Sequence, residues 1–131
     1  LVRAAKVGKR ASCFDFPDAS SVMDKLREES AEVEDAVRSG DEEQIFEEIG
    51  DLLLTVTSLA RKLHVNPEEA LYRATDKFIA RFEKIENEVL AMGKVPSELP
   101  VSALDAIWDS VKQKEKSTEN IIKNTEADHE T

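Results

Sequence analysis

The chain has 131 residues, of which 40% are hydrophobic, and this is enough for one domain with a core of its own. Its 28 acidic and 18 basic residues give a net charge of −10, which repels phosphate backbones and excludes a nucleic-acid polymer or an anionic membrane as the expected partner. Aromatic residues make up 5% and charged residues 35%, with four Gly and four Pro, a balance typical of an all-α fold.

The longest apolar run, within residues 52–60, is too short to span a bilayer and is broken by Thr and Ser. No segment combines a basic start with an apolar middle, as a secretory leader does. Cys13 is the only cysteine, so an internal disulfide is excluded and a reducing compartment fits. We therefore expect a cytoplasmic protein with no membrane partner.

Residues 1–10 have a short helical pattern with basic side chains, and a turn around Pro17 ends it. A second helix is expected over about residues 18–39, because Asp18 or Ser20 can cap its start.

Gly40 and Asp41 then provide a stop signal and the next helix cap. A third helix is predicted over about residues 42–63, where apolar residues recur at helical spacing. Leu53 and Leu54 widen its apolar face, so we expect this helix to be the most buried one.

The fourth helix begins with a capping Asn66 followed by Pro67, and it ends near residue 92. Ser102 opens a short last helix. The predicted fold is a helical bundle within residues 1–116, followed by a polar and disordered tail over residues 117–131.

Four carboxylates lie along the apolar sides of the second and third helices. Glu29 falls inside the apolar stripe of the second helix, and Glu32 follows it at i+3. Glu48 and Asp51 have the same spacing on the third helix. Two antiparallel helices can bring all four together, although paired acids in so acidic a chain also occur on solvated faces.

Unpaired buried carboxylates cost several kcal/mol per ion, and few Lys or Arg residues lie near these four positions to offset that cost. Hard oxygen ligands suit Mg²⁺, and Mn²⁺ can take its place. The pattern therefore indicates a metal site that also has room for substrate phosphate oxygens.

Two further pairs stand at i and i+4 on later helices. Lys77 and Arg81 lie beside a phenylalanine stripe and can place two cations near a phosphate, or pair with acids of a neighbouring helix. Trp108 and Lys112 form the other pair, in which the Trp either stacks on a base or packs in the core.

Together these residues resemble the MazG family of nucleoside triphosphate pyrophosphohydrolases, in the all-α NTP pyrophosphatase superfamily. The hallmark EExxE is found at residues 28–32 and ExxD at residues 48–51. Shorter matches surround this core: RAAKVGKRAS at 3–12, FDFPD at 14–18, DKFIARFEKIE at 76–86 and IWDSVK at 107–112. The match covers most of residues 3–114 and is nearest to the C-terminal catalytic domain of two-domain members.

The resemblance implies a four-helix-bundle-like fold with a short C-terminal helix, assembled as a homodimer. It also implies a set of magnesium ligands: Glu29, Glu32, Glu48 and Asp51. Phosphate-contacting cations correspond to Lys25, Lys77 and Arg81, and nucleotide-contacting positions to Trp108 and Lys112. Thr75 stands where many members have Asn, so an amide contact from that position is not expected here.

The implied reaction is hydrolysis of an NTP or dNTP between the α and β phosphates, with Glu32 or Glu29 as the catalytic base. Another branch of the superfamily shares the carboxylates, such as a dUTP or dCTP pyrophosphatase or a phosphoribosyl-ATP pyrophosphohydrolase. An alternative of a different class is a helical domain that binds nucleotides without turnover.

Overall fold

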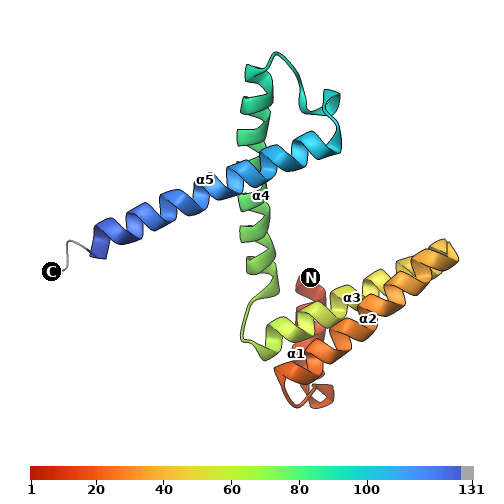
Figure 1. Cartoon of the computed structure of the whole chain (residues 1–131). Helices are drawn as coiled ribbons and strands as arrows, with labels where there is room; N and C mark the ends of the chain where they lie inside the picture. The colour runs from red at the N-terminus through yellow and green to blue at the C-terminus, as the bar shows by residue number, and fades with distance from the viewer. Residues whose placement is uncertain (128–131) are drawn as a thin grey trace. The chain divides into compact units, whose positions relative to one another are not determined.

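The computed structural model describes residues 1–127, and every regular element in that part of the chain is helical (Figure 1). Its five α-helices and two 3₁₀ helices are α1 (Val2–Arg10), η1 (Ser12–Phe14), α2 (Ala19–Ser39), α3 (Glu42–Lys62), α4 (Pro67–Ala91), η2 (Pro96–Glu98) and α5 (Val101–Ala127). The predicted all-α class is confirmed. None of these described helices has the combination of length and hydrophobicity that a bilayer crossing requires.

The chain divides into two compact units, Leu1–Tyr72 and Arg73–Thr131. The first unit contains α1, α2, α3 and the beginning of α4. The second contains the rest of α4 together with α5. Each unit is therefore built around its own pair of long helices.

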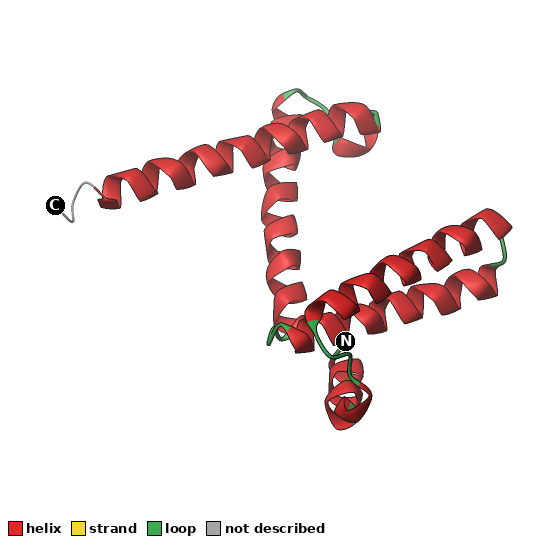
Figure 2. Cartoon of the chain, turned by 60° about the horizontal axis from the view of Figure 1, so that its bottom comes forward, coloured by secondary structure: helices red, strands yellow, loops and turns green. Residues whose placement is uncertain are grey.

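In the first unit, α2 and α3 pack side by side as an antiparallel pair (Figure 2). Gly40 joins them with a φ of 71°, a conformation that glycine adopts without strain, and its N–H donates to the Ala36 carbonyl at 3.1 Å. The Asp41 side chain then caps α3 by accepting from the backbone N–H groups of Glu43 and Gln44. The stop and the cap predicted from sequence are thus both present, and they set the register of the helix pair.

The N-terminal segment is fastened to α3 by an ion pair. Asp15, which follows η1, accepts hydrogen bonds from Nε and Nη2 of Arg61, and both side chains are largely buried. Helix α1 also lies against α3, where Gly8 faces Arg61. A methyl group at Gly8 would overlap Nη1 of Arg61, so any larger residue there would displace the Arg61 side chain.

The second unit has an apolar core at the crossing of α4 and α5. Its buried members are Ile85 and Val89 of α4 and Val111 of α5, and Trp108 is among the half-buried residues packed on them. Gly93, with a φ of 74°, ends α4 and turns the chain towards α5.

Helix α5 is longer than the sequence analysis expects, because it extends through Ala127 rather than ending near residue 116. Residues 117–127 are all exposed, so no packing holds them. Local bonds support the helix instead: the side chains of Ser117, Thr118 and Thr125 donate to carbonyls four residues earlier. The rest of the predicted tail, residues 128–131, lies outside the described part.

Helix α3 is not the most buried helix within the chain, contrary to the expectation from its broad apolar face. Its buried residues are Thr55 and Thr57, whereas Leu53 and Leu54 are 51% and 50% exposed. A face this wide exceeds what the helices packed on it within the unit cover, so part of it remains at the surface.

Candidate metal and nucleotide site

Glu29 faces the interior of the helix pair and is 5% exposed. Val22 and Ala36, which precede and follow it by two helical turns, are fully buried on the same side of α2. Residues seven apart share one face of a helix, so the register that buries the two apolar side chains also buries the carboxylate. The inward orientation predicted for Glu29 is confirmed.

Helix α3 supplies two more carboxylates at the same point. Glu48 and Asp51, one turn apart, each place an oxygen so that these atoms and an oxygen of Glu29 lie within 4.8 Å of one another. Glu32 adjoins this group, since its hydrogen bond with Glu29 raises the pKa of Glu32, and the charge of Glu48 raises it further. The structure therefore brings three of the four predicted acids together at ligand distance, with Glu32 beside them.

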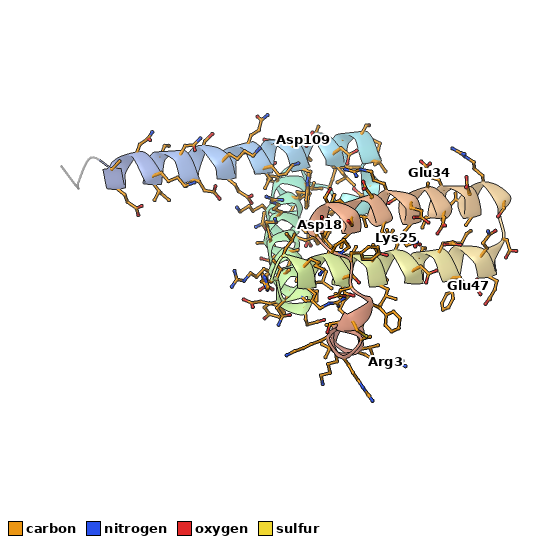
Figure 3. All side chains as sticks on the ribbon, turned by 90° about the horizontal axis from the view of Figure 1, so that it is seen from below. Arg3, Asp18, Lys25, Glu34, Glu47 and Asp109 are labelled. Carbon is orange, nitrogen blue, oxygen red and sulfur yellow. The ribbon has the colours of Figure 1, made fainter. Side chains whose placement is uncertain are left out.

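Lys25 supplies a positive charge at the edge of this group (Figure 3). Its Nζ lies 2.8 Å from Oε1 of Glu29 and 3.2 Å from Oε1 of Glu28. The hydrogen bond from Lys25 holds the pKa of Glu29 below its usual value although burial opposes this shift. The same two contacts raise the pKa of Lys25. One ammonium group thus faces several carboxylates, which leaves a net negative charge.

Two buried oxygens in this group are unsatisfied. Oε2 of Glu29 and Oε2 of Glu48 have no hydrogen-bond partner within residues 1–127. A buried carboxylate oxygen without a partner is costly, and a cation bound between α2 and α3 removes that cost. Carboxylate oxygens are also the ligands that Mg²⁺ and Mn²⁺ take in proteins, so the residues present fit such an ion.

Other acids of the same two helices have a different setting. Glu34 of α2 and Glu47 of α3 project from the outer faces of the pair, and the Glu34 side chain is 71% exposed (Figure 3). The alternative considered from the sequence, that paired acids lie on a solvated face, holds for Glu34 and Glu47 but not for the buried Glu29.

In the second unit, a predicted phosphate-contacting residue, Arg81, and a predicted nucleotide-contacting residue, Trp108, come together. Cζ of Arg81 lies 5.7 Å from the centroid of the Trp108 ring, and Phe78 contacts the same ring at a centroid distance of 5.4 Å. Trp108 therefore packs beside the core and also contacts a cation. Lys77 is exposed on α4, and Nζ of Lys112 lies 3.9 Å from Asp109.

Arg81 pairs with an acid of a neighbouring helix, as the alternative offered from the sequence has it, but the identity of that acid was not predicted. Nε of Arg81 donates to Glu115 at 2.9 Å, and Lys84 contacts the same carboxylate at 3.3 Å. Glu115 stands one helical turn after Lys112 in a polar stretch, and nothing in its spacing distinguishes it from other exposed acids.

A groove of about 530 Å³ is lined by residues of α4 and α5, and none of the predicted site residues is among them. Its wall carries both acids and lysines around the single apolar side chain of Val111. The carboxylates that could hold a metal ion lie instead on α2 and α3.

Comparison with known proteins places this geometry in context. A family model described as the MazG nucleotide pyrophosphohydrolase domain matches residues 18–85, which include α2, α3 and most of α4. The chain is 41% identical over 114 residues to a protein of Thermotoga maritima named nucleoside triphosphate pyrophosphohydrolase/pyrophosphatase MazG, covering 86% of this chain and 44% of the relative.

It is also 36% identical over 119 residues to the nucleoside triphosphate pyrophosphohydrolase of Escherichia coli K12, covering 88% of this chain and 45% of the relative. The chain thus spans less than half the length of these two relatives. A third match, 33% identical over 75 residues, is the uncharacterized protein YabN of Bacillus subtilis, of which 15% is covered. The family model spans the helix pair α2 and α3, which carries the clustered acids. The chain therefore belongs to the MazG nucleotide pyrophosphohydrolase domain family.

Proposed function

We propose that this chain hydrolyses nucleoside or deoxynucleoside triphosphates between the α and β phosphates, releasing a nucleoside monophosphate and pyrophosphate, in a magnesium-dependent reaction. The observation that carries the proposal is the convergence of Glu29, Glu48 and Asp51 with two buried, unpaired carboxylate oxygens. This arrangement lies inside the segment that matches the family. Removal of unwanted nucleotides from the cellular pool is the biological role that we propose.

The names of the relatives support the substrate class. Two proteins that cover most of this chain are named nucleoside triphosphate pyrophosphohydrolases. Its family makes the chain a hydrolase domain. Its substrates are part of our proposal, because the chain covers less than half of either relative.

Glu29, Glu48 and Asp51 are the residues that would hold Mg²⁺ or Mn²⁺, with Glu32 as the fourth carboxylate beside them. When bound, the ion neutralises the triphosphate and lowers the pKa of a water molecule. The rigid antiparallel helix pair fixes these carboxylates before the substrate arrives, which spares reorganisation during the reaction.

The remaining predicted residues act on the substrate. Lys25 lies at the carboxylates and can extend one of its three donors to a phosphate oxygen. On α4, Lys77 and Arg81 supply further phosphate contacts, with the forked donors of Arg81 suited to two oxygens at once. Trp108 and Lys112 contact the nucleoside portion.

Proton transfer completes the proposed reaction. Glu32 or Glu29 accepts the proton of the attacking water as it bonds to the phosphorus atom, and pyrophosphate leaves. The neighbouring Glu29 carboxylate raises the pKa of Glu32, which favours Glu32 as the group that takes up a proton.

Assembly and location are part of the same proposal. A homodimer is supported by the exposed apolar side chains of α3, among them Leu53 and Leu54, because a second copy can cover them. A cytoplasmic setting is supported by the nucleotide substrate and by the lone, exposed Cys13.

The test is pyrophosphate release from each common NTP and dNTP, with millimolar Mg²⁺, with Mn²⁺ and with EDTA. We expect release with either metal and none with EDTA. Thermal melts should show a higher melting temperature with Mg²⁺, since an ion that binds only the folded state stabilises it.

A protein that binds nucleotides but releases no pyrophosphate would refute the proposal in favour of a regulatory domain. Strong preference for dUTP, dCTP or phosphoribosyl-ATP would assign it to another branch of the superfamily. EDTA-resistant turnover together with identical melting curves would eliminate the metal site.

A further inference from the structure

Arg81 is held from two sides within the second unit. Its Nε donates to Oε2 of Glu115 at 2.9 Å, and its guanidinium carbon lies over the Trp108 ring at 5.7 Å. The Arg81 and Glu115 side chains are 19% and 24% exposed, so this pair is more shielded from water than the other ion pairs between α4 and α5.

The atom used in this bond matters. A guanidinium has five N–H donors, one on Nε and four on the two terminal nitrogens. A carboxylate that binds Nε leaves the terminal pair as a planar fork, the geometry that binds two phosphate oxygens together. Glu115 therefore fixes the base of the guanidinium without occupying the fork.

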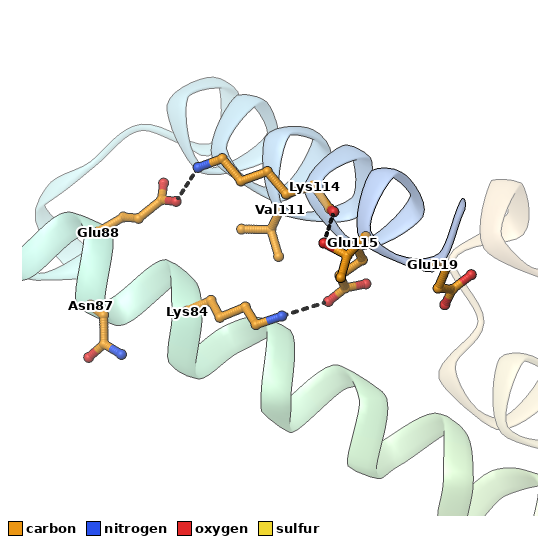
Figure 4. Close-up of a pocket in the computed structure, with 8 residues that line it drawn as sticks. Lys84, Asn87, Glu88, Val111, Lys114, Glu115 and Glu119 are labelled. Carbon is orange, nitrogen blue, oxygen red and sulfur yellow. Dashed lines mark hydrogen bonds and ion pairs between the residues drawn. The ribbon is translucent and has the colours of Figure 1, made fainter. Parts of the chain in front are cut away.

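Lys84 contributes to the same arrangement. Its Nζ lies 3.3 Å from Oε1 of Glu115, the oxygen that Arg81 Nε does not use (Figure 4). The Glu115 carboxylate is thereby held through both oxygens, and hydrogen bonding from Arg81, followed by Lys84, lowers its pKa. It remains charged at neutral pH and can serve as a fixed support.

We propose that Glu115 is a positioning residue for triphosphate binding, which holds Arg81 by Nε against Trp108 so that its terminal amino groups are preset for phosphate. This inference rests on the proposed function, because it assigns Arg81 a phosphate as its ligand. An arginine that is ordered before binding avoids the loss of side-chain freedom when the substrate arrives.

The structure offers a matched control. Glu88 of α4 and Lys114 of α5 form another ion pair across the same two helices at 3.2 Å, beside the Lys84 and Glu115 pair (Figure 4). This pair does not include Arg81 or Trp108. Glu88→Ala therefore removes an interhelical ion pair of the same kind without disturbing the proposed support.

The experiment measures kcat and KM for the nucleotide of the panel that releases pyrophosphate fastest. Glu115→Ala should raise KM about ten- to thirtyfold, the effect of freeing one arginine side chain, and leave kcat within about threefold. Glu115→Gln, which keeps an acceptor oxygen for Nε, should recover much of the loss. Glu88→Ala should leave both constants at the wild-type value.

A double-mutant cycle separates positioning from general stabilisation. If Glu115 acts through Arg81, adding Glu115→Ala to Arg81→Ala should change kcat/KM by less than about twofold. Emission from Trp108, the only tryptophan in the chain, should shift in Glu115→Ala and not in Glu88→Ala.

Several outcomes would overturn the inference. Multiplicative effects in the cycle would mean that Glu115 is merely structural, and a lower KM in Glu115→Ala would mean that it competes with phosphate. If Glu115→Ala does not fold, Glu115→Met replaces it, because its side chain has a similar length but offers Nε no acceptor oxygen. An unchanged KM and an unchanged Trp108 emission in Glu115→Met would decide against positioning. A wild-type protein with no turnover would instead remove the proposed function and, with it, this inference.

Discussion

Glu29 has one carboxylate oxygen paired with Lys25 and the other buried without a partner. The oxygen paired with Lys25 is what a structural ion pair would show. The buried oxygen without a partner is what a metal ligand would show. Mutation distinguishes these roles, because a structural acid affects folding and a metal ligand affects turnover.

Glu29→Gln keeps the size of the side chain but removes its charge. Loss of the Lys25 pair and relief of repulsion from Glu48 and Asp51 oppose each other, so the unfolding free energy of the metal-free protein should change by less than about 1 kcal/mol. Turnover should nevertheless fall at least about a hundredfold, because a carboxylate ligand is lost. Urea titration in EDTA and pyrophosphate release with Mg²⁺ measure the two effects.

Glu34→Gln is the control, since this acid lies on the outer face of α2 and should affect neither property. A Glu29→Gln protein that unfolds, but keeps full activity per folded molecule, would show that Glu29 serves mainly as the partner of Lys25.

Asp15 gives the protein a defined pH dependence. The hydrogen bond from Arg61, opposed by burial, holds the pKa of Asp15 below its usual value of 3.8. The unfolded state therefore binds the proton first as pH falls. The stabilising effect of the pair is complete above the unfolded pKa and disappears as pH falls through the folded pKa.

We therefore expect wild type to be more stable than Asp15→Asn above about pH 5, and this difference to shrink as pH falls below the usual aspartate pKa. Melting curves across this range measure it, with the exposed Asp105→Asn as a comparison. A difference that stays constant down to the lowest pH would show that the ionised carboxylate is not the source of the stability.

At the scale of whole elements, most helix boundaries follow from local sequence. Caps at Asp18, Asp41 and Asn66 and the stop at Gly40 are present as predicted, because each acts within a few residues of its own position. Residues 117–127 are an exception, because they are helical where a disordered tail was predicted. That prediction rested on their few apolar residues, which do not reveal the local hydrogen bonds of an exposed helix.

The candidate site was predictable to a similar degree. The acids of α2 and α3 follow from helical spacing, because register alone brings them to one face. The contact of Asp15 with Arg61 was not foreseen, and for Arg81 an acid of a neighbouring helix was considered without Glu115 being identified. Both join residues far apart in sequence, and no periodic pattern encodes such a contact. The proposed limit of the domain at residue 116 stays a prediction.

The packing of α1 on α3 predicts an unusual response to a helix-favouring substitution. Alanine at a helical glycine usually adds about 0.5–1 kcal/mol of stability. Gly8→Ala should instead destabilise by about 1 kcal/mol, because the new methyl group displaces Arg61 from Asp15. Chemical denaturation of both alanine variants, at Gly8 and at Gly50 in α3, gives the comparison.

Gly50→Ala should show the usual gain, since a Cβ there has no neighbour within 4 Å among the described residues. In an Arg61→Ala background, the change in unfolding free energy caused by Gly8→Ala should reverse its sign, so that the substitution stabilises the protein. Stabilisation by Gly8→Ala in the wild-type background would show that α1 does not pack tightly against Arg61.

For the whole molecule, the main question is what covers the exposed apolar face of α3. The face includes Phe46, Ile49, Leu53, Leu54 and Val56, all at least 41% exposed. So broad an apolar surface is typical of an interface rather than of a solvated helix. A homodimer, as proposed above, accounts for it without another partner.

Leu53→Glu should therefore convert a dimer into a monomer, because association would bury a charge at a cost of several kcal/mol. Ile122→Glu on α5 is the matched control, since Ile122 has the same 51% exposure as Leu53 but lies on the solvated end of its helix. Sedimentation equilibrium at micromolar concentration measures the mass. A wild-type protein that sediments as a monomer would contradict the proposal, as would a Leu53→Glu variant that remains a dimer.

The short connection between α2 and α3 also has a kinetic consequence. The Gly40 turn closes the helix pair locally, so its contacts form across little intervening chain. Such a hairpin can assemble early in folding, before α5 exists as a helix, and its carboxylates come together at that stage. If the helix pair is already formed in the folding transition state, an ion bound there lowers the energy of that state as well as of the native state. Mg²⁺ should then accelerate refolding rather than only slow unfolding.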